Sequence, residues 1–158
     1  MYRLVVIDDE YIVVEGIKAM IARKKLNYEV VGCAYDGIHG LEVVQKEKPD
    51  LVITDIRIPG LDGLSLIEEA RESCTDTVFV VISGYTEFEY ARRALRLGVK
   101  GYIDKPISIE KLTDVLDMVE KECFQAKEEN SQLERKRIGQ ENIKNLFDQS
   151  VRAMTKGS

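Results

Sequence analysis

Five short apolar runs, separated by longer segments with helical periodicity, constrain the fold of this chain more than any other feature. Each run is rich in β-branched residues, as is typical of parallel strands buried on both faces. The segments between the runs predict helices over about 10–24, 37–47, 64–73 and 87–97. The pattern therefore predicts an α/β fold, a doubly wound sheet of five parallel strands. The five runs are Leu4–Ile7, Val30–Cys33, Leu51–Thr54, Val78–Ile82 and Gly101–Ile103.

Polar residues lie within two positions of the end of four of these runs. Asp8 and Asp9 follow the first run, Asp55 the third, Ser83 the fourth and Lys105 the fifth. Sheets of this type bind ligands at the carboxyl ends of their strands, so these side chains should meet in one crevice. Clustered carboxylates are tolerated around a hard cation such as Mg²⁺, and a lysine and a hydroxyl add donors for phosphoryl oxygens. The set suits formation of an aspartyl phosphate.

Each of these residues also has an ordinary structural explanation. Asp9 or Glu10 would serve as the cap of the following helix, Ser83 as a turn residue, and a Lys-Pro dipeptide alone is a weak signal. Four strand ends carrying acid, acid, hydroxyl and lysine together favour phosphate chemistry.

Four motifs carry a family resemblance: VVIDDE at 5–10, DLVITDIRIPGLDGL at 50–64, VVISGY at 80–85 and GYIDKPI at 101–107. Together they resemble the CheY-like receiver domains of two-component response regulators, over roughly residues 2–122. More narrowly, the chain resembles the receivers of YesN/AraC-type regulators, in which a DNA-binding region follows.

The resemblance implies a site and a strand order. Asp55 would be the phosphoacceptor, and Asp8, Asp9 and the backbone carbonyl of Arg57 would hold Mg²⁺ or Mn²⁺. Ser83 and Lys105 would contact the phosphoryl group, which a sensor histidine kinase would supply. The strand order would be 2-1-3-4-5, as in flavodoxin-like folds, and the peptide bond before Pro106 would be cis.

The same resemblance implies a conformational switch. Tyr102 would be the switch aromatic, and the alternative is a half-buried strand aromatic with its hydroxyl in water. Phosphorylation would change the face made by the fourth helix, fifth strand and fifth helix, called here the 4-5-5 face. A solvated, charged helix surface is the alternative. Residues expected to make partner or self contacts there are Glu87, Glu89, Arg92, Arg93, Arg96 and Lys100.

Two bulky residues, Arg57 and Tyr85, each lie two positions beyond a site residue. We expect them to hinder the attacking water and so to prolong the lifetime of the phosphate.

Residues 123–158 are expected to form a helical linker or coiled-coil extension of the receiver at 1–122. Apolar positions recur three and four residues apart, which fits a parallel two-stranded coiled coil and a homodimer. A helix that packs its first turns on the sheet and continues as a charged connector explains the pattern equally well. The seam comprises Leu112, Leu116, Val119, Cys123, Ala126, Asn130 and Leu133. Contact with DNA would require an output domain that this chain lacks.

Composition narrows the setting. A net charge of -5 argues against a nucleic-acid surface over the whole molecule. Three widely spaced cysteines indicate reduced thiols, and no apolar stretch resembles a signal peptide or a membrane span, so a cytoplasmic protein is expected. His39 is the only histidine, so the phosphodonor should be a separate molecule.

Three other functions compete. A haloacid-dehalogenase-like phosphatase needs a second aspartate where Arg57 stands, and a flavodoxin-like carrier would not place acids at its flavin phosphate. A pseudo-receiver that acts only as an interaction module is the third alternative, although every expected site residue is present.

Overall fold

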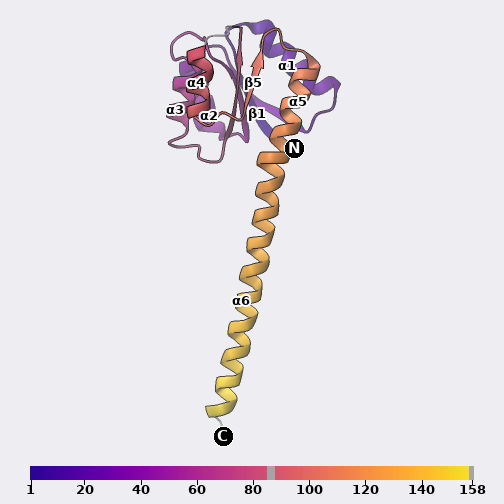
Figure 1. Ribbon diagram of the computed structural model, residues 1–158, viewed down its shortest axis with the longest axis vertical. Coiled ribbons are helices and arrows are strands. Elements are labelled where there is room, and N and C mark those ends of the chain that lie inside the picture. Colours follow the sequence, from indigo (N-terminus) through magenta and orange to yellow (C-terminus); the bar gives the residue numbers. More distant parts are fainter. Residues whose placement is uncertain (85–87, 157–158) are drawn as a thin grey trace. The chain divides into compact units, whose positions relative to one another are not determined.

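The computed structural model describes residues 1–84 and 88–156. A five-stranded parallel sheet with the order β2-β1-β3-β4-β5 forms its centre (Figure 1). The predicted fold class and strand order are therefore confirmed. Tyr85 and Glu87 lie outside the described residues. The strands are β1 (Tyr2–Ile7), β2 (Tyr28–Ala34), β3 (Leu51–Asp55), β4 (Val78–Ser83) and β5 (Gly101–Asp104).

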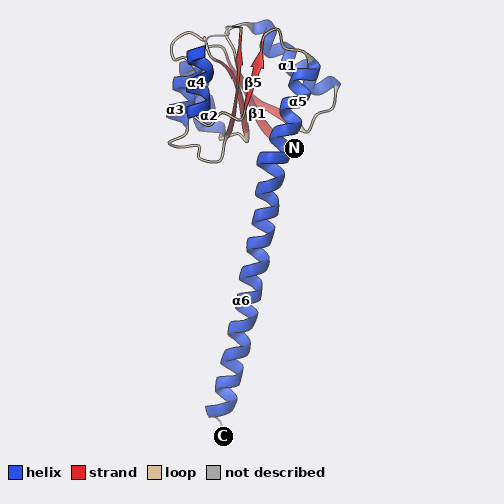
Figure 2. Cartoon of the chain, in the orientation of Figure 1, coloured by secondary structure: helices blue, strands red, loops and turns tan. Residues whose placement is uncertain are grey.

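Helices cover both faces of the sheet. Figure 2 shows α1 and α5 on one side and α2, α3 and α4 on the other. This arrangement explains the nearly continuous apolar runs, because both faces of a central strand are then buried; all five residues of β3 are buried. The helices of this layer structure are α1 (Tyr11–Arg23), α2 (Gly37–Glu47), α3 (Gly63–Ala70), α4 (Phe88–Arg96) and α5 (Ile109–Val119).

The boundaries differ from the predicted ones by a few residues. The third helix was expected to reach residue 73, but α3 ends at Ala70, and the following residues form turns in which the Cys74 amide donates to the Ala70 carbonyl at 2.8 Å. Strand β2 begins at Tyr28, opposite Tyr2 of β1. Helix α2 begins at a side-chain cap, because Asp36 accepts a hydrogen bond from the His39 amide at 2.8 Å.

By its contacts the chain divides into two compact units, Met1–Val119 and Glu120–Ser158. The first three positions of the predicted coiled-coil seam, Leu112, Leu116 and Val119, are buried on α5 within the first unit. They therefore belong to the core of the first unit. The prediction of one seam from Leu112 to Leu133 is wrong for this part, since apolar residues at helical spacing serve a core as well as a coil.

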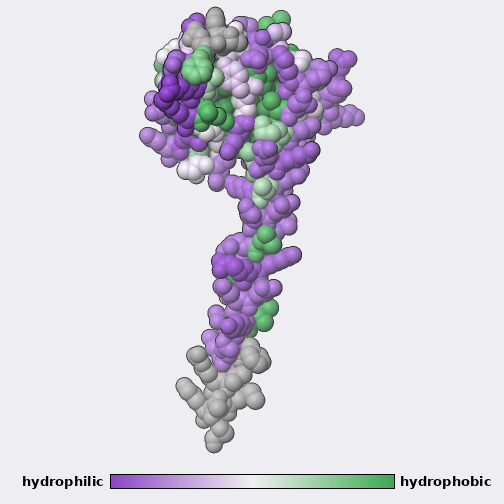
Figure 3. Space-filling view, viewed as in Figure 1, coloured by the Kyte–Doolittle hydropathy of each residue, from purple (hydrophilic) through white to green (hydrophobic). Residues whose placement is uncertain are grey.

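The second unit is helical. A π-helix, η1 (Glu120–Gln125), precedes α6 (Ala126–Lys156). Because a π-helix takes up more residues per turn, it shifts the heptad frame. Figure 3 shows a mostly hydrophilic surface on α6 with scattered hydrophobic side chains. Leu133 of α6 is 63% exposed. No helix among the described residues is both long and apolar enough to cross a membrane.

The close approach of α3 to β3 makes one glycine indispensable. Gly63 donates its amide to the Ile56 carbonyl at 2.8 Å, and a Cβ atom on Gly63 would lie 2.1 Å from the Asp55 carbonyl oxygen. We expect Gly63→Ala to lower the free energy of unfolding by about 3 kcal/mol, because backbone must move. Urea denaturation followed by circular dichroism measures this change.

Gly16 provides the control for that substitution. It lies inside α1, and a Cβ atom on Gly16 would meet no other atom within 4 Å. Gly16→Ala should stabilise the protein by roughly 0.5–1 kcal/mol through helix propensity. Equal effects of the two substitutions would contradict the packing argument.

Candidate functional site

The parallel strands bring the predicted polar residues to one edge of the sheet. Asp8 follows β1, Asp55 and Ser83 are the last residues of β3 and β4, and Lys105 follows β5. Because β1 and β4 both pair with β3 in parallel, the carboxyl ends of these three strands lie at the same edge of the sheet. The crevice expected for this fold therefore holds these side chains.

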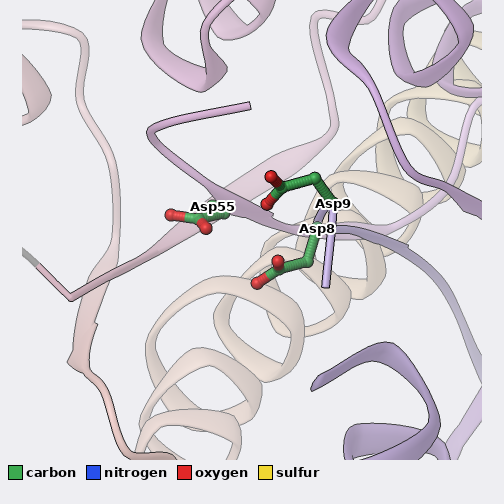
Figure 4. Close-up of side chains that lie close together, drawn as sticks. All are labelled: Asp8, Asp9 and Asp55. Atoms are coloured by element: carbon green, nitrogen blue, oxygen red, sulfur yellow. The ribbon is translucent and has the colours of Figure 1, made fainter. Parts of the chain in front are cut away.

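Three carboxylates gather there (Figure 4). Asp8, Asp9 and Asp55 each offer one oxygen, and these oxygens all lie within 4.8 Å of one another. Asp8 is fully buried and Asp55 is 5% exposed, whereas Asp9 is exposed to solvent. Such a cluster is repulsive unless positive charge balances it.

Lys105 supplies part of that charge. Its ammonium group donates a hydrogen bond to Asp55 Oδ2 at 2.9 Å and lies 3.0 Å from Asp8 Oδ2 and 3.5 Å from Glu10 Oε1. Burial disfavours the charged lysine, but the contacts with Asp55 and Asp8 outweigh it and hold the pKa of Lys105 above its usual value. Lys105 therefore stays protonated.

The burial of Asp8 disfavours its ionised form. Burial raises its pKa to about 6, against the lowering effects of the Glu10 amide and the Lys105 ammonium. The Glu10 amide donates to Asp8 Oδ1 at 2.9 Å. Asp8 Oδ2, although close to Lys105, has no hydrogen-bond partner among the described residues. A buried carboxylate oxygen without a hydrogen-bond partner is a candidate ligand for a cation.

The donor set suits a hard divalent cation. Among the residues that the structure describes, the converging groups are carboxylates, without histidine or cysteine. Mg²⁺ prefers one or two carboxylates together with water and phosphate oxygens. Asp8, Asp9 and Asp55 are the residues that fit such an ion.

The other expected site residues have varied surroundings. Ser83 is buried, and its carbonyl accepts the Lys105 amide at 2.9 Å. The peptide bond between Lys105 and Pro106 is cis, as expected. Tyr102 is half-buried on β5 and packs against the core on the side of α2, α3 and α4. Tyr85 lies outside the described residues.

Arg57 has a partner that its position in the sequence did not reveal. Its Nε donates to the Tyr90 hydroxyl at 3.0 Å. Arg93, expected on the 4-5-5 face, instead donates to Ser65 Oγ at 2.9 Å. A charged residue at helical spacing does not indicate which neighbouring element its side chain will reach.

Glu10 is not the side-chain cap that one alternative proposed. It is the N-cap residue of α1, but its carboxylate makes no capping hydrogen bond. Of the three acids after β1, Asp8 and Glu10 have carboxylate oxygens close to the Lys105 ammonium.

Comparison with known proteins agrees with this geometry. Residues 4–117 match the family model of the response regulator receiver domain. The chain is 35% identical over 119 residues to the uncharacterized transcriptional regulatory protein YesN of Bacillus subtilis, covering 75% of this chain and 32% of YesN. It is 30% identical over 130 residues to the transcriptional regulatory protein HptR of Staphylococcus aureus, covering 82% of this chain and 51% of HptR.

Solved structures give the same result. The receiver domain of AraT, a response regulator from Geobacillus stearothermophilus, matches with a TM-score of 0.74 and 36% identity, over 80% of this chain and 98% of that one. The signal receiver domain of the putative response regulator NarL from Mycobacterium tuberculosis matches with a TM-score of 0.68 and 31% identity, over 73% of this chain and 94% of that one.

This chain spans about a third of YesN and half of HptR. The matched segment, the sheet order and the acidic cluster at its carboxyl edge agree, and the chain belongs to the response regulator receiver domains, which are phosphoacceptor signalling modules.

Proposed function

We propose that this chain accepts a phosphoryl group from a sensor histidine kinase on Asp55 in a magnesium-dependent reaction. One observation carries the proposal: the buried Asp55 carboxylate is hydrogen-bonded to Lys105 and lies within 4.8 Å of the Asp8 and Asp9 oxygens. A nucleophilic carboxylate, the Lys105 ammonium and a candidate metal site thus lie together at one edge of the sheet.

In the reaction, an Asp55 oxygen attacks the phosphorus of the donor's phosphohistidine. The bond from phosphorus to the imidazole nitrogen breaks, its electron pair stays on the histidine, and an acyl phosphate forms on Asp55. Lys105 and Ser83 hold the phosphoryl oxygens. Asp8, Asp9 and the Arg57 carbonyl would bind Mg²⁺ or Mn²⁺, which neutralises charge on the transferred group.

The phosphoryl group would then change the conformation of the 4-5-5 face. Ser83 follows the new oxygens, and the ring of Tyr102 moves to fill the space behind it. Arg57 and Tyr85 tune the lifetime of the phosphate by obstructing the attacking water. Family membership supports these roles.

The signal would leave through a longer regulator. We assign residues 1–122 to the receiver and 123–158 to a helical linker toward a DNA-binding output region, acting in the cytoplasm. The names of YesN and HptR as transcriptional regulators support this organisation.

Self-association is a further part of the proposal. Exposed basic residues on α4 and exposed acidic residues on α5 flank β5, so two copies related by a two-fold axis would pair opposite charges. The basic residues are Arg92 and Arg96 with the nearby Lys100, and the acidic ones are Glu110 and Asp114. A homodimer through α6 is the alternative.

Incubation with acetyl phosphate and Mg²⁺, followed by intact mass spectrometry, tests the phosphoacceptor. We expect one added phosphoryl group on the wild type and on Asp117→Asn, an exposed control on α5, and none on Asp55→Asn. Equal labelling of Asp55→Asn would refute the assignment. No labelling of the wild type would favour the pseudo-receiver, and sustained release of inorganic phosphate would favour the phosphatase.

Thermal unfolding with and without Mg²⁺ tests the metal site. At a Mg²⁺ concentration ten times the dissociation constant, binding to the folded state should stabilise the wild type by about 1.4 kcal/mol. Asp9→Asn, which removes an exposed carboxylate of the cluster, should need more Mg²⁺ for the same shift. Asp117→Asn should respond as the wild type does, and an unchanged response of Asp9→Asn would argue against this ligand.

Molecular mass in solution, measured with and without phosphorylation, separates the two dimer surfaces. Leu95 is 79% exposed on α4 and Leu133 is 63% exposed on α6. Leu95→Glu should abolish phosphorylation-dependent dimers if the 4-5-5 face pairs, because a buried unpaired charge is costly. Loss of dimers in Leu133→Glu alone would favour α6, and a monomer under all conditions would exclude both.

A further inference from the structure

Helix α4 is anchored by little apolar burial. Of its side chains only Ala94 is buried, while Phe88 and Leu95 are 76% and 79% exposed. The neighbouring α3, by contrast, buries five of its eight residues. Because burial of apolar surface is the main source of packing energy, polar contacts contribute an unusually large share of what holds α4.

One such contact joins α4 to the loop that follows Asp55. Arg57, two residues after Asp55, donates from Nε to the Tyr90 hydroxyl at 3.0 Å. The guanidinium carbon also lies 5.6 Å from the centre of the Tyr90 ring, within the range of cation–π attraction. Tyr90 thus holds Arg57 through both its ring and its hydroxyl.

A second contact lies one turn further along α4. Arg93 donates to Ser65 Oγ at 2.9 Å, and its guanidinium lies 3.7 Å from Asp62 Oδ1 and 3.7 Å from Glu68 Oε2. Asp62 is also the cap of α3, because it accepts the Ser65 amide at 2.9 Å. Residues three apart share a helix face, so Tyr90 and Arg93 present one surface to the segment after Asp55.

On its other side, the same loop is packed tightly. The Gly37 amide at the start of α2 donates to the Pro59 carbonyl at 2.9 Å. A Cβ atom on Gly37 would lie 1.7 Å from the Leu61 carbonyl oxygen, so no room remains between the loop and α2. Residues 56–62 therefore have little room to move toward α2.

We propose that Tyr90 and Arg93 are positioning residues that fasten α4 to residues 57–68, the loop after Asp55 and the first turns of α3, so that occupancy of the Asp55 site and the position of α4 change together. The coupling to a ligand rests on the proposed function, since that function places a Mg²⁺ ligand at Arg57. The mechanical link itself stands on the contacts alone. Linkage is reciprocal, so α4 in turn biases binding at the site.

Hydrogen exchange of the full chain, measured by mass spectrometry with and without Mg²⁺, tests the link. Without Mg²⁺, amides in 88–96 should exchange about threefold faster in Tyr90→Phe and about tenfold faster in Tyr90→Ala and Arg93→Ala. Mg²⁺ should slow exchange in both 56–62 and 88–96 of the wild type. In Tyr90→Ala and Arg93→Ala the slowing should persist in 56–62 and disappear in 88–96.

Arg23→Ala is the control, because Arg23 is an exposed arginine at the end of α1, on the opposite face of the sheet from α4 and outside the proposed dimer surfaces. It should exchange as the wild type does. Wild-type behaviour of Tyr90→Ala and Arg93→Ala in 88–96 would overturn the proposal. If Mg²⁺ alters nothing in the wild type, the metal assignment fails separately, and the Mg²⁺-free exchange rates in 88–96 still decide the link.

Discussion

The contact of Lys105 with Asp8 and Asp55 is the interaction on which the site depends. The sheet forces three carboxylates together at the ends of β1 and β3, and two of them are buried. A single ammonium, 2.9 Å from Asp55 and 3.0 Å from Asp8, offsets only part of their charge. Burial, and to a smaller extent the negative charge of Asp55, raises the pKa of Asp8, so a further cation would favour its ionised form. The fold therefore maintains a local deficit of positive charge, which a divalent cation removes.

The sequence predicted this arrangement because its determinants are local. Each site residue lies within two positions of the end of an apolar run, and parallel strands bring their carboxyl ends to one edge of the sheet. The boundary between the first unit and the C-terminal helical unit was harder to predict. Leu112, Leu116 and Val119 have the spacing of a coiled-coil seam, and only the tertiary structure shows that α5 buries them in the sheet. The π-helix at Glu120–Gln125 has no comparable sequence signal.

The side-chain contacts of α4 were beyond sequence reasoning for a different reason. Arg57 and Arg93 have long, flexible side chains, and their partners depend on how closely α3 and α4 approach. The contrast between these helices has a physical consequence. A helix held by many buried side chains opens only with the whole domain, whereas a helix held by a few polar contacts can move at a small cost in free energy. Signal-bearing elements are drawn from the second group.

The charge at the Asp55 site and the weak apolar anchoring of α4 suit a phosphoacceptor that keeps its phosphoryl group better than a phosphatase that releases it. In the proposed reaction, a phosphoryl group on Asp55 would add negative charge beside Asp8 and Asp9, Lys105 would be shared among more oxygens, and the neighbouring backbone would adjust. An enzyme would need a proton donor at position 57 to discharge the intermediate, but that position holds an arginine bonded to Tyr90 on α4. The arginine at this position thus connects the site to α4, a helix on which only Ala94 is buried.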